Sequence, residues 1–229
     1  MSSVETLPRD MNGAWIGNGG RLSMATLMNR HGTDKLFHHH YEDEYERHFA
    51  PFRDLPIRLL EIGVGGFKGI DCGGESLKVW RDYFSQAHIV GIDCEPKTLD
   101  FGPRVEIHQC DANDQAALRG LNEACGPFDI IIDDGSHFQE HVLNAFSQLW
   151  MLLNPGGIYV IEDMATAYWP EYGGDPEKPP VIYLLFACIN AIHQRYWRPE
   201  PLKPAETDPA TIKSVHVSRE IAFITKMKG

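Results

Sequence analysis

The chain has 229 residues, of which 43% are hydrophobic and 23% charged, an ordinary balance for one globular domain with a sizeable core. Its 21 basic and 32 acidic residues give a formal net charge of −11, which argues against nucleic acid or an anionic membrane as a partner. No stretch is long and apolar enough for a transmembrane helix, and the first ten residues are too polar for a secretory signal. The five cysteines are odd in number and lack C-x-x-C spacing, which predicts reduced thiols and a cytoplasmic protein.

The N-terminal part is expected to be a short helical segment joined to one domain. Residues 1–30 form a predicted leader, loose over 1–21 and helical over 22–30. Apolar residues at helical spacing predict a second short helix over 41–49. The single domain is expected to occupy residues 31–229.

After Pro56, short apolar runs alternate with amphipathic stretches, which is typical of a parallel sheet covered by helices. Strands are predicted over 57–62, 88–93, 105–109, 128–133 and 157–162. Helices are predicted over 76–84, 114–124 and 137–153. Most of these strands carry an acidic residue at or just beyond the carboxyl end, where ligands bind in open α/β sheets.

The last third of the chain contains a long loop, a helix and a hairpin. Residues 164–180 are rich in glycine, proline and aromatic residues, and we expect them to form an active-site lid. A helix is predicted from Val181 to about Trp197, followed by a proline-rich connector to Pro209. Alternation over 214–226 predicts two strands joined by a tight turn, which would close the sheet antiparallel.

A glycine motif, LLEIGVGG, follows the first predicted strand at residues 59–66. Glycines there allow the backbone to approach a ligand closely, but their spacing departs from the G-x-G-x-x-G of a pyrophosphate cradle. The pattern suits a nucleoside that carries an amino acid; a purely structural turn is an equally good interpretation.

Two acids follow the next strands. Asp93 can accept hydrogen bonds from both ribose hydroxyls, and we favour this role over a turn or cap. Asp111 can accept from an exocyclic adenine amine, although a helix cap explains it equally well.

The strongest group of residues is Asp133-Asp134-Gly135-Ser136-His137 together with Glu162-Asp163. Four carboxylates at two adjacent strand ends, roughly 5 Å apart if the strands pair, would repel one another without a cation. Asp134, Glu162 and Asp163 can share one ion, and an all-oxygen set suits Mg²⁺ or Mn²⁺ better than zinc. His137 faces the same mouth and is placed to act as a general base.

A competing pattern overlaps this group. Residues 137–141 read HFQEH, the H-x-x-E-H signature of one class of zinc peptidases. That signature belongs within a helix, whereas His137 directly follows a predicted strand and an Asp-Gly turn. It remains a minor alternative.

Taken together, the motifs resemble class I S-adenosylmethionine-dependent methyltransferases, and more narrowly the metal-dependent sugar O-methyltransferases of macrolide and related antibiotic pathways, the mycinamicin type. The segments that carry the resemblance are HGTDK (31–35), LLEIGVGG (59–66), GGESLKVW (73–80), GIDCEPK (91–97), GPFDIIIDDGSH (126–137), NPGGIYVIED (154–163) and AYWPEYGG (167–174). The resemblance implies a Rossmann-like α/β fold with a mostly parallel seven-stranded sheet and an antiparallel C-terminal hairpin.

The resemblance also implies roles for individual residues. It places the metal on Asp134, Glu162 and Asp163, makes His137 the base, and puts Asp133 near the methionine end of the cofactor. The residues expected around the cofactor are Lys35, Glu61, Gly63, Gly65, Ser76, Asp93, Asp111 and Asp133. Some relatives carry an additional N-terminal domain that builds an oligomer, whereas residues 1–30 precede HGTDK here, so a homo-oligomer is left open.

The expected function is therefore methyl transfer from S-adenosylmethionine, with Mg²⁺, to a hydroxyl of a sugar or glycosylated natural product in antibiotic biosynthesis. The alternatives are a zinc metallopeptidase, an NAD-dependent oxidoreductase and a protein that binds S-adenosylmethionine without catalysis. The glycine spacing argues against the oxidoreductase, and the base and metal set argues against the non-catalytic protein.

Overall fold

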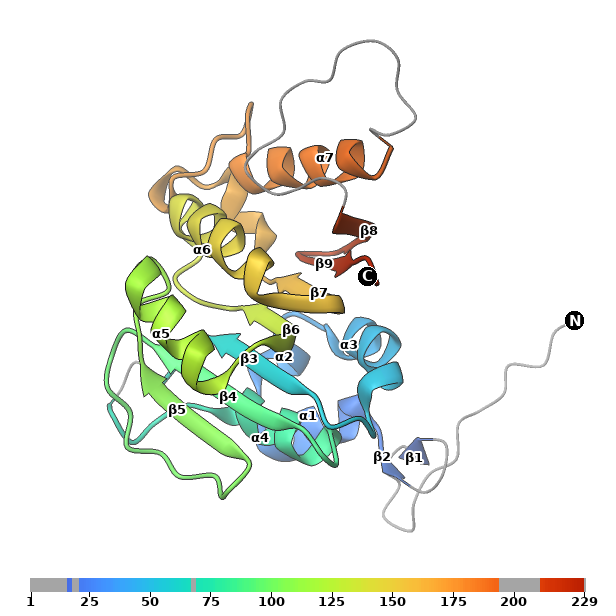
Figure 1. The fold of residues 1–229 in the computed structure, drawn as a ribbon, viewed down its shortest axis with the longest axis vertical. Coiled ribbons are helices and arrows are strands. Elements are labelled where there is room, and N and C mark those ends of the chain that lie inside the picture. The colour runs from blue at the N-terminus through green and yellow to red at the C-terminus, as the bar shows by residue number, and fades with distance from the viewer. Residues whose placement is uncertain (1–15, 18–20, 67–68, 194–210, 229) are drawn as a thin grey trace, which may run out of the picture.

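The computed structural model describes residues 16–17, 21–66, 69–193 and 211–228, and its central element is a seven-stranded sheet (Figure 1). The strand order is β5-β4-β3-β6-β7-β9-β8. The parallel strands are β3 (Arg58–Ile62), β4 (His88–Asp93), β5 (Val105–Gln109), β6 (Phe128–Asp133) and β7 (Leu153–Ile161). An antiparallel hairpin, β8 (Ile212–Ser218) and β9 (Ile221–Lys226), completes the sheet through β9, which pairs with β7. The predicted fold class is confirmed.

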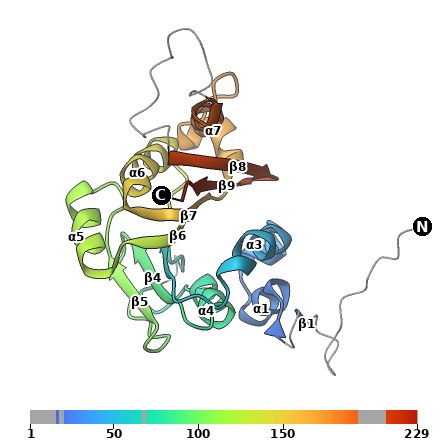
Figure 2. The ribbon, with the colours of Figure 1, turned by 45° about the vertical axis from the view of Figure 1, so that its right-hand side comes forward.

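Helices cover both faces of the sheet (Figure 2). On one face lie α5 (Gln115–Cys125), α6 (Gln139–Leu152) and α7 (Pro180–His193). On the other lie α1 (Met24–His31), α3 (Glu42–Phe49) and α4 (Glu75–Tyr83). A short helix, α2 (Asp34–Phe37), and a 3-10 turn, η1 (Ala50–Phe52), connect these N-terminal elements.

Each face of the sheet has its own hydrophobic core, because side chains alternate along a strand. In β6, Ile131 packs with α5, α6 and α7, whereas Ile130 and Ile132 pack with α1, α3 and α4. All three isoleucines are fully buried. Burial of each such side chain contributes roughly 1.5–3 kcal/mol.

The N-terminal helices are part of the second core. Tyr45 and Phe49 of α3 are fully buried, and their rings lie 4.9 and 5.6 Å from the ring of Trp80 on α4. Met24 and Leu27 of α1 are buried in the same core. The helices that the sequence predicts over 22–30 and 41–49 therefore help to cover the sheet.

A few boundaries differ from the sequence predictions. The strand β7 begins at Leu153 rather than Gly157, with a register shift against β6 between Phe128 and Ile130. The helix α6 begins at Gln139 because His137 has a φ of +59° and Phe138 is extended. The sequence analysis did not predict α2 or the short antiparallel pair β1 (Ile16–Gly17) and β2 (Arg21–Leu22). The expected end of the last helix at Trp197 and the connector to Pro209 lie outside the described residues.

Within the described part of the chain, no helix has the length and apolar character needed to cross a membrane.

Candidate active site

The order of the strands opens a cleft at the carboxyl end of the sheet. From β3 the chain proceeds outward to β4 and β5 on one side, and β6 and β7 continue the sheet on the other. Ligands of open α/β sheets bind where the strand order reverses in this way. A cavity of about 380 Å³ lies there. It is lined by five of the residues predicted to surround the cofactor: Gly63, Gly65, Asp93, Asp111 and Asp133.

Gly63 allows the loops after β3 and β6 to approach each other. Its φ is +91°, and a Cβ at this position would lie 2.0 Å from the carbonyl oxygen of Asp134. The backbone N–H of Asp134 also donates to the carbonyl of Ile62 at 3.1 Å. Only glycine fits this close approach, which leaves the backbone open towards the cavity.

Asp93 and Asp111 are both oriented by backbone groups. Asp93 Oδ2 accepts from Val64 N–H at 3.1 Å, and its Oδ1 accepts from Glu95 N–H at 2.9 Å. Asp111 Oδ1 accepts from Asn113 N–H at 2.8 Å and closes a turn. The cap of α5 is Asp114, so Asp111 does not serve as the helix cap.

A second cavity of about 520 Å³ adjoins the first, and both are lined by Gly63, Gly65, Asp134 and Gly135. The second cavity is also lined by four other predicted site residues: Lys35, Ser76, His137 and Asp163. Predicted cofactor residues thus line mainly the first cavity, and the predicted base lines the second.

His137 lies between two carboxylates on the wall of the second cavity. Its Nε2 is 3.3 Å from Asp163 Oδ2 and 3.9 Å from Asp134 Oδ1. The Tyr41 hydroxyl donates to Asp163 Oδ1 at 3.0 Å and fixes that carboxylate. His137 and Asp163 both have positive φ, +59° and +52°. Strained backbone of this kind concentrates at functional sites.

Lys35 provides a buried positive charge among the acids. Its Nζ lies 2.5 Å from Asp134 Oδ2, 2.7 Å from Glu162 Oε1 and 3.4 Å from Glu61 Oε1. Burial by itself would lower the pKa of Lys35, but the three carboxylates outweigh it and hold the pKa well above its usual value. Lys35 therefore stays protonated and compensates a cluster of negative charge.

Glu162 is bonded to the N-terminal helices. Besides the contact with Lys35, its Oε1 accepts a hydrogen bond from the Tyr45 hydroxyl of α3. Burial, followed by the charge of Asp134, raises the pKa of Glu162 well above its usual value. The sequence analysis identified neither Tyr45 nor Tyr41 as a site residue, because their spacing also fits a purely apolar helix face.

Glu61 and Asp133 are buried near the carboxyl ends of β3 and β6, and Asp133 forms part of the wall of the first cavity. Glu61 Oε2 accepts from Ser76 Oγ and Trp80 Nε1, both at 2.9 Å, which ties β3 to α4. Asp133 Oδ2 accepts from the Tyr159 hydroxyl at 3.1 Å. Burial raises the pKa of both acids to about 7.

The donors present fit a hard divalent cation. Carboxylate oxygens of Asp134 and Asp163 lie within 4.8 Å of each other, and His137 stands beside them as the neighbouring base. The Lys35 ammonium between Asp134 and Glu162 shows that these acids require positive charge. Carboxylate oxygens beside an open cavity suit Mg²⁺ or Mn²⁺. Glu162 lies outside this group because it is bonded to Lys35 and Tyr45.

The zinc-peptidase interpretation of residues 137–141 is wrong for this fold. His137 precedes α6 instead of lying in it, and His141 Nδ1 is 2.7 Å from Ser136 Oγ. Among the described residues, His137 is grouped with Asp134 and Asp163 rather than with His141.

Residues 164–180 form an ordered segment beside His137. It contains two 3-10 turns, η2 (Met164–Tyr168) and η3 (Pro170–Tyr172). The ring of Tyr172 lies 5.5 Å from that of Phe138, next to His137. Tyr168 and Trp169 are 44% and 47% exposed, which leaves two aromatic rings available for an acceptor.

Comparison with known proteins identifies the family. The family model described as a methyltransferase domain matches residues 13–164. The chain is 42% identical over 205 residues to 8-demethyl-8-alpha-L-rhamnosyl tetracenomycin-C 2'-O-methyltransferase of Streptomyces olivaceus, which covers 89% of this chain and 54% of the relative. It is 39% identical over 216 residues to mycinamicin VI 2''-O-methyltransferase of Micromonospora griseorubida, covering 92% of this chain and 54% of the relative.

A solved structure agrees with these relatives. The MycE methyltransferase from the mycinamycin biosynthetic pathway, in complex with Mg and SAH, aligns with a TM-score of 0.85 and 38% identity, over 91% of this chain and 55% of that one. The chain spans about half the length of the curated relatives it matches. With the strand order and the glycine turn at its switch point, these matches show that the chain belongs to the methyltransferase domain family.

Proposed function

We propose that the protein is a magnesium-dependent O-methyltransferase that transfers a methyl group from S-adenosylmethionine to a hydroxyl of a sugar or glycosylated natural product. The observation that carries this proposal is the junction of two cavities at Gly63 and Asp134, with His137 on the wall of the second. The names of the two relatives, which methylate a rhamnosyl tetracenomycin and mycinamicin VI, support the acceptor class.

The first cavity is assigned to S-adenosylmethionine, which supplies a methyl group on a cationic sulfur. The fixed carboxylate of Asp93 would accept from the ribose hydroxyls, and Asp111 would face the adenine. The backbone around Gly63 and Gly65 would meet the amino-acid end near Asp133. Glu61 and Ser76 would act indirectly, by holding β3 against the start of α4, and Lys35 would act through Asp134.

Asp134 and Asp163 would hold the metal, and Glu162 would take part through the carboxylate oxygen that is not bonded to Lys35 and Tyr45. When bound, Mg²⁺ or Mn²⁺ lowers the pKa of an acceptor hydroxyl and orients it. Among these residues, Asp163 is fixed by Tyr41 and Glu162 by Lys35 and Tyr45. The metal ligands are thus connected to the N-terminal helices as well as to the sheet.

His137 would take the proton of the acceptor hydroxyl. Asp163 and Asp134 flank its imidazole, so the positive charge that it gains is stabilised. General-base catalysis of this kind typically contributes 10²–10⁴-fold. The segment 164–180 would close over the acceptor as a lid, with Tyr168 and Trp169 packing on its ring.

A cytoplasmic location and a homo-oligomer also belong to this proposal. All five cysteines fall in the described part of the chain and are free thiols, which supports a reducing compartment.

The direct test is methyl transfer from labelled S-adenosylmethionine to a panel of rhamnosylated polyketides and macrolide glycosides. We expect a labelled glycoside whose formation stops with EDTA and returns with Mg²⁺. Product formation that is indifferent to EDTA would remove the metal from the proposal. Tight binding of S-adenosylmethionine without transfer to any acceptor would favour a non-catalytic binding protein.

A further inference from the structure

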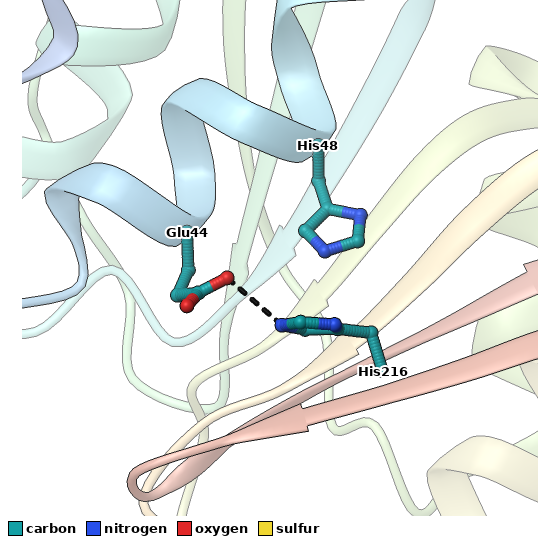
Figure 3. A group of neighbouring side chains, drawn as sticks. All are labelled: Glu44, His48 and His216. Carbon is teal, nitrogen blue, oxygen red and sulfur yellow. Dashed lines mark hydrogen bonds and ion pairs between the residues drawn. The ribbon is translucent and has the colours of Figure 1, made fainter. Parts of the chain in front are cut away.

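A second group of metal-binding side chains lies between α3 and β8, apart from the candidate active site. It consists of Glu44 and His48 on α3 and His216 on β8 (Figure 3). Residues four apart on a helix face the same way, so Glu44 and His48 both point towards the hairpin. The ligand atoms of all three lie within 4.8 Å of one another, and none of them belongs to the group around His137.

The contacts within this group leave binding capacity unused. Glu44 Oε2 lies 2.9 Å from His216 Nε2 and 3.3 Å from Nη1 of the exposed Arg47, which leaves Glu44 Oε1 available. His48 Nε2 is buried and has no hydrogen-bond partner among the residues that the structure describes. A buried polar atom without a partner destabilises the folded state. A bound ion would supply the partner that His48 Nε2 lacks.

Packing holds the two imidazoles close together. The ring of His48 stacks on Phe223 at 4.1 Å with an angle of 11° between the planes. The rings of His48 and His216 are 4.7 Å apart. Glu44 and His216 have side chains that are 17% and 35% exposed, so an ion can reach the group from solvent.

We propose that Glu44, His48 and His216 form a binding site for Zn²⁺ that joins α3 to β8. Two imidazole nitrogens and one carboxylate are a ligand set that zinc takes in proteins, with a fourth position for water. Mg²⁺ prefers oxygen ligands, so the two sites select different metals.

The site connects parts of the chain that are far apart in sequence. The same helix carries Tyr45, which lies between Glu44 and His48 and donates to Glu162. Zinc that bridges α3 and β8 therefore fixes the helix that supports the candidate active site. Because an ion bound only by the folded state stabilises it, zinc raises the melting temperature.

The test is a zinc titration of metal-free protein against a chromophoric chelator, in excess Mg²⁺. We expect the wild type to bind one Zn²⁺ tightly. Both His216→Gln and Glu44→Gln should lower the zinc affinity by at least 10–100-fold, which is the loss typical when a residue that only orients a metal ligand is removed. These side chains are partly exposed, so both variants should fold; the melting temperature without metal checks this. Zinc should raise the melting temperature of the wild type and not that of these variants.

Two control variants test whether the loss of zinc affinity is specific to this group. His31 Nε2 lies 2.8 Å from Asp82 Oδ2, and His31 belongs to no metal-binding group among the described residues. The variant His31→Gln should therefore bind zinc as tightly as the wild type. Asp163→Asn, in the candidate active site, should do so too. Zinc that binds the wild type and His216→Gln equally, or a wild type that binds no zinc, would overturn the proposal.

Discussion

At the scale of single residues, Lys35 is the group on which the charge balance of the site depends. It is 1% exposed and lies against Glu61, Asp134 and Glu162. Removing one partner from a buried ion pair leaves the others uncompensated, which typically costs 3–5 kcal/mol. The local acid excess calls for a cation, but the sequence did not show that a lysine before the first strand would provide it.

Replacement of Lys35 by Met is therefore expected to lower the free energy of unfolding of the metal-free protein by about 3–5 kcal/mol. Denaturant unfolding measures this. Lys226→Met is the matched control, because its ammonium donates to the carbonyls of Trp150 and Leu153, lies over the Trp150 ring at 5.6 Å and has no carboxylate partner among the described residues. Equal losses in the two variants would show that Lys35 does not balance the acids.

The close approach at Gly63 gives a second prediction. Gly63→Ala places a methyl group 2.0 Å from the Asp134 carbonyl oxygen, so the two loops must separate. We expect S-adenosylmethionine binding, measured by calorimetry, to fall at least about tenfold, equivalent to 1.4 kcal/mol. Gly120→Ala lies in the middle of α5, where the added methyl group meets nothing within 4 Å beyond the adjacent residues and the helix's own backbone, and it should leave binding unchanged. Normal binding by Gly63→Ala would remove this glycine from the cofactor site.

Glu61 predicts a pH dependence of stability. Burial raises its pKa to about 7, well above the pKa of 4.5 that is usual for a glutamate in water. Between these two pKa values the folded protein holds a proton that the unfolded chain releases. The resulting contribution to the free energy of unfolding is therefore fully present below about pH 4.5 and is lost as the pH rises through 7. The free energy of unfolding of Glu61→Gln should decline less over this range than that of the wild type. If the free energy of unfolding declined equally in both proteins, a group other than Glu61 would be responsible for the pH dependence.

At the scale of secondary structure, the predicted strands and helices were mostly correct, because the spacing of apolar residues along the chain indicates which side chains each strand or helix buries. The strands β4, β5 and β6 have the predicted ends. The start of α6 was wrong because the positive φ of His137 depends on its contacts with Asp134 and Asp163. The pairing of Glu162 with Lys35 and Tyr45 likewise depends on how α2 and α3 pack, which no motif encodes.

The segment 164–180 gives a prediction at this scale. Trp169 is 47% exposed and packs only partly, with its ring 5.9 Å from that of Tyr172. Trp169→Ala should raise the KM for the glycoside roughly tenfold, since the burial of an aromatic ring against a ligand contributes about 1 kcal/mol or more to the binding free energy. The Kd for S-adenosylmethionine should not change. Tyr183→Ala is the control, because Tyr183 is also an exposed aromatic residue but lies on α7, outside the segment 164–180. An unchanged KM would exclude Trp169 from acceptor binding.

At the scale of the whole molecule, the two faces of the sheet have different tasks. The helices α5, α6 and α7 cover one face. The N-terminal helices cover the other and also provide Lys35, Tyr41 and Tyr45 to the acids at the strand ends. The candidate site of this chain is therefore built partly from residues that precede β3, the first strand of the seven-stranded sheet.

The most direct test of the proposed chemistry is the turnover of His137→Gln with saturating labelled S-adenosylmethionine and Mg²⁺. We expect the rate to fall by about 10²–10⁴-fold, the usual contribution of a general base, while the Kd for S-adenosylmethionine is unchanged. His88→Gln, at the opposite end of β4, should retain full activity. Wild-type turnover in His137→Gln would contradict the account.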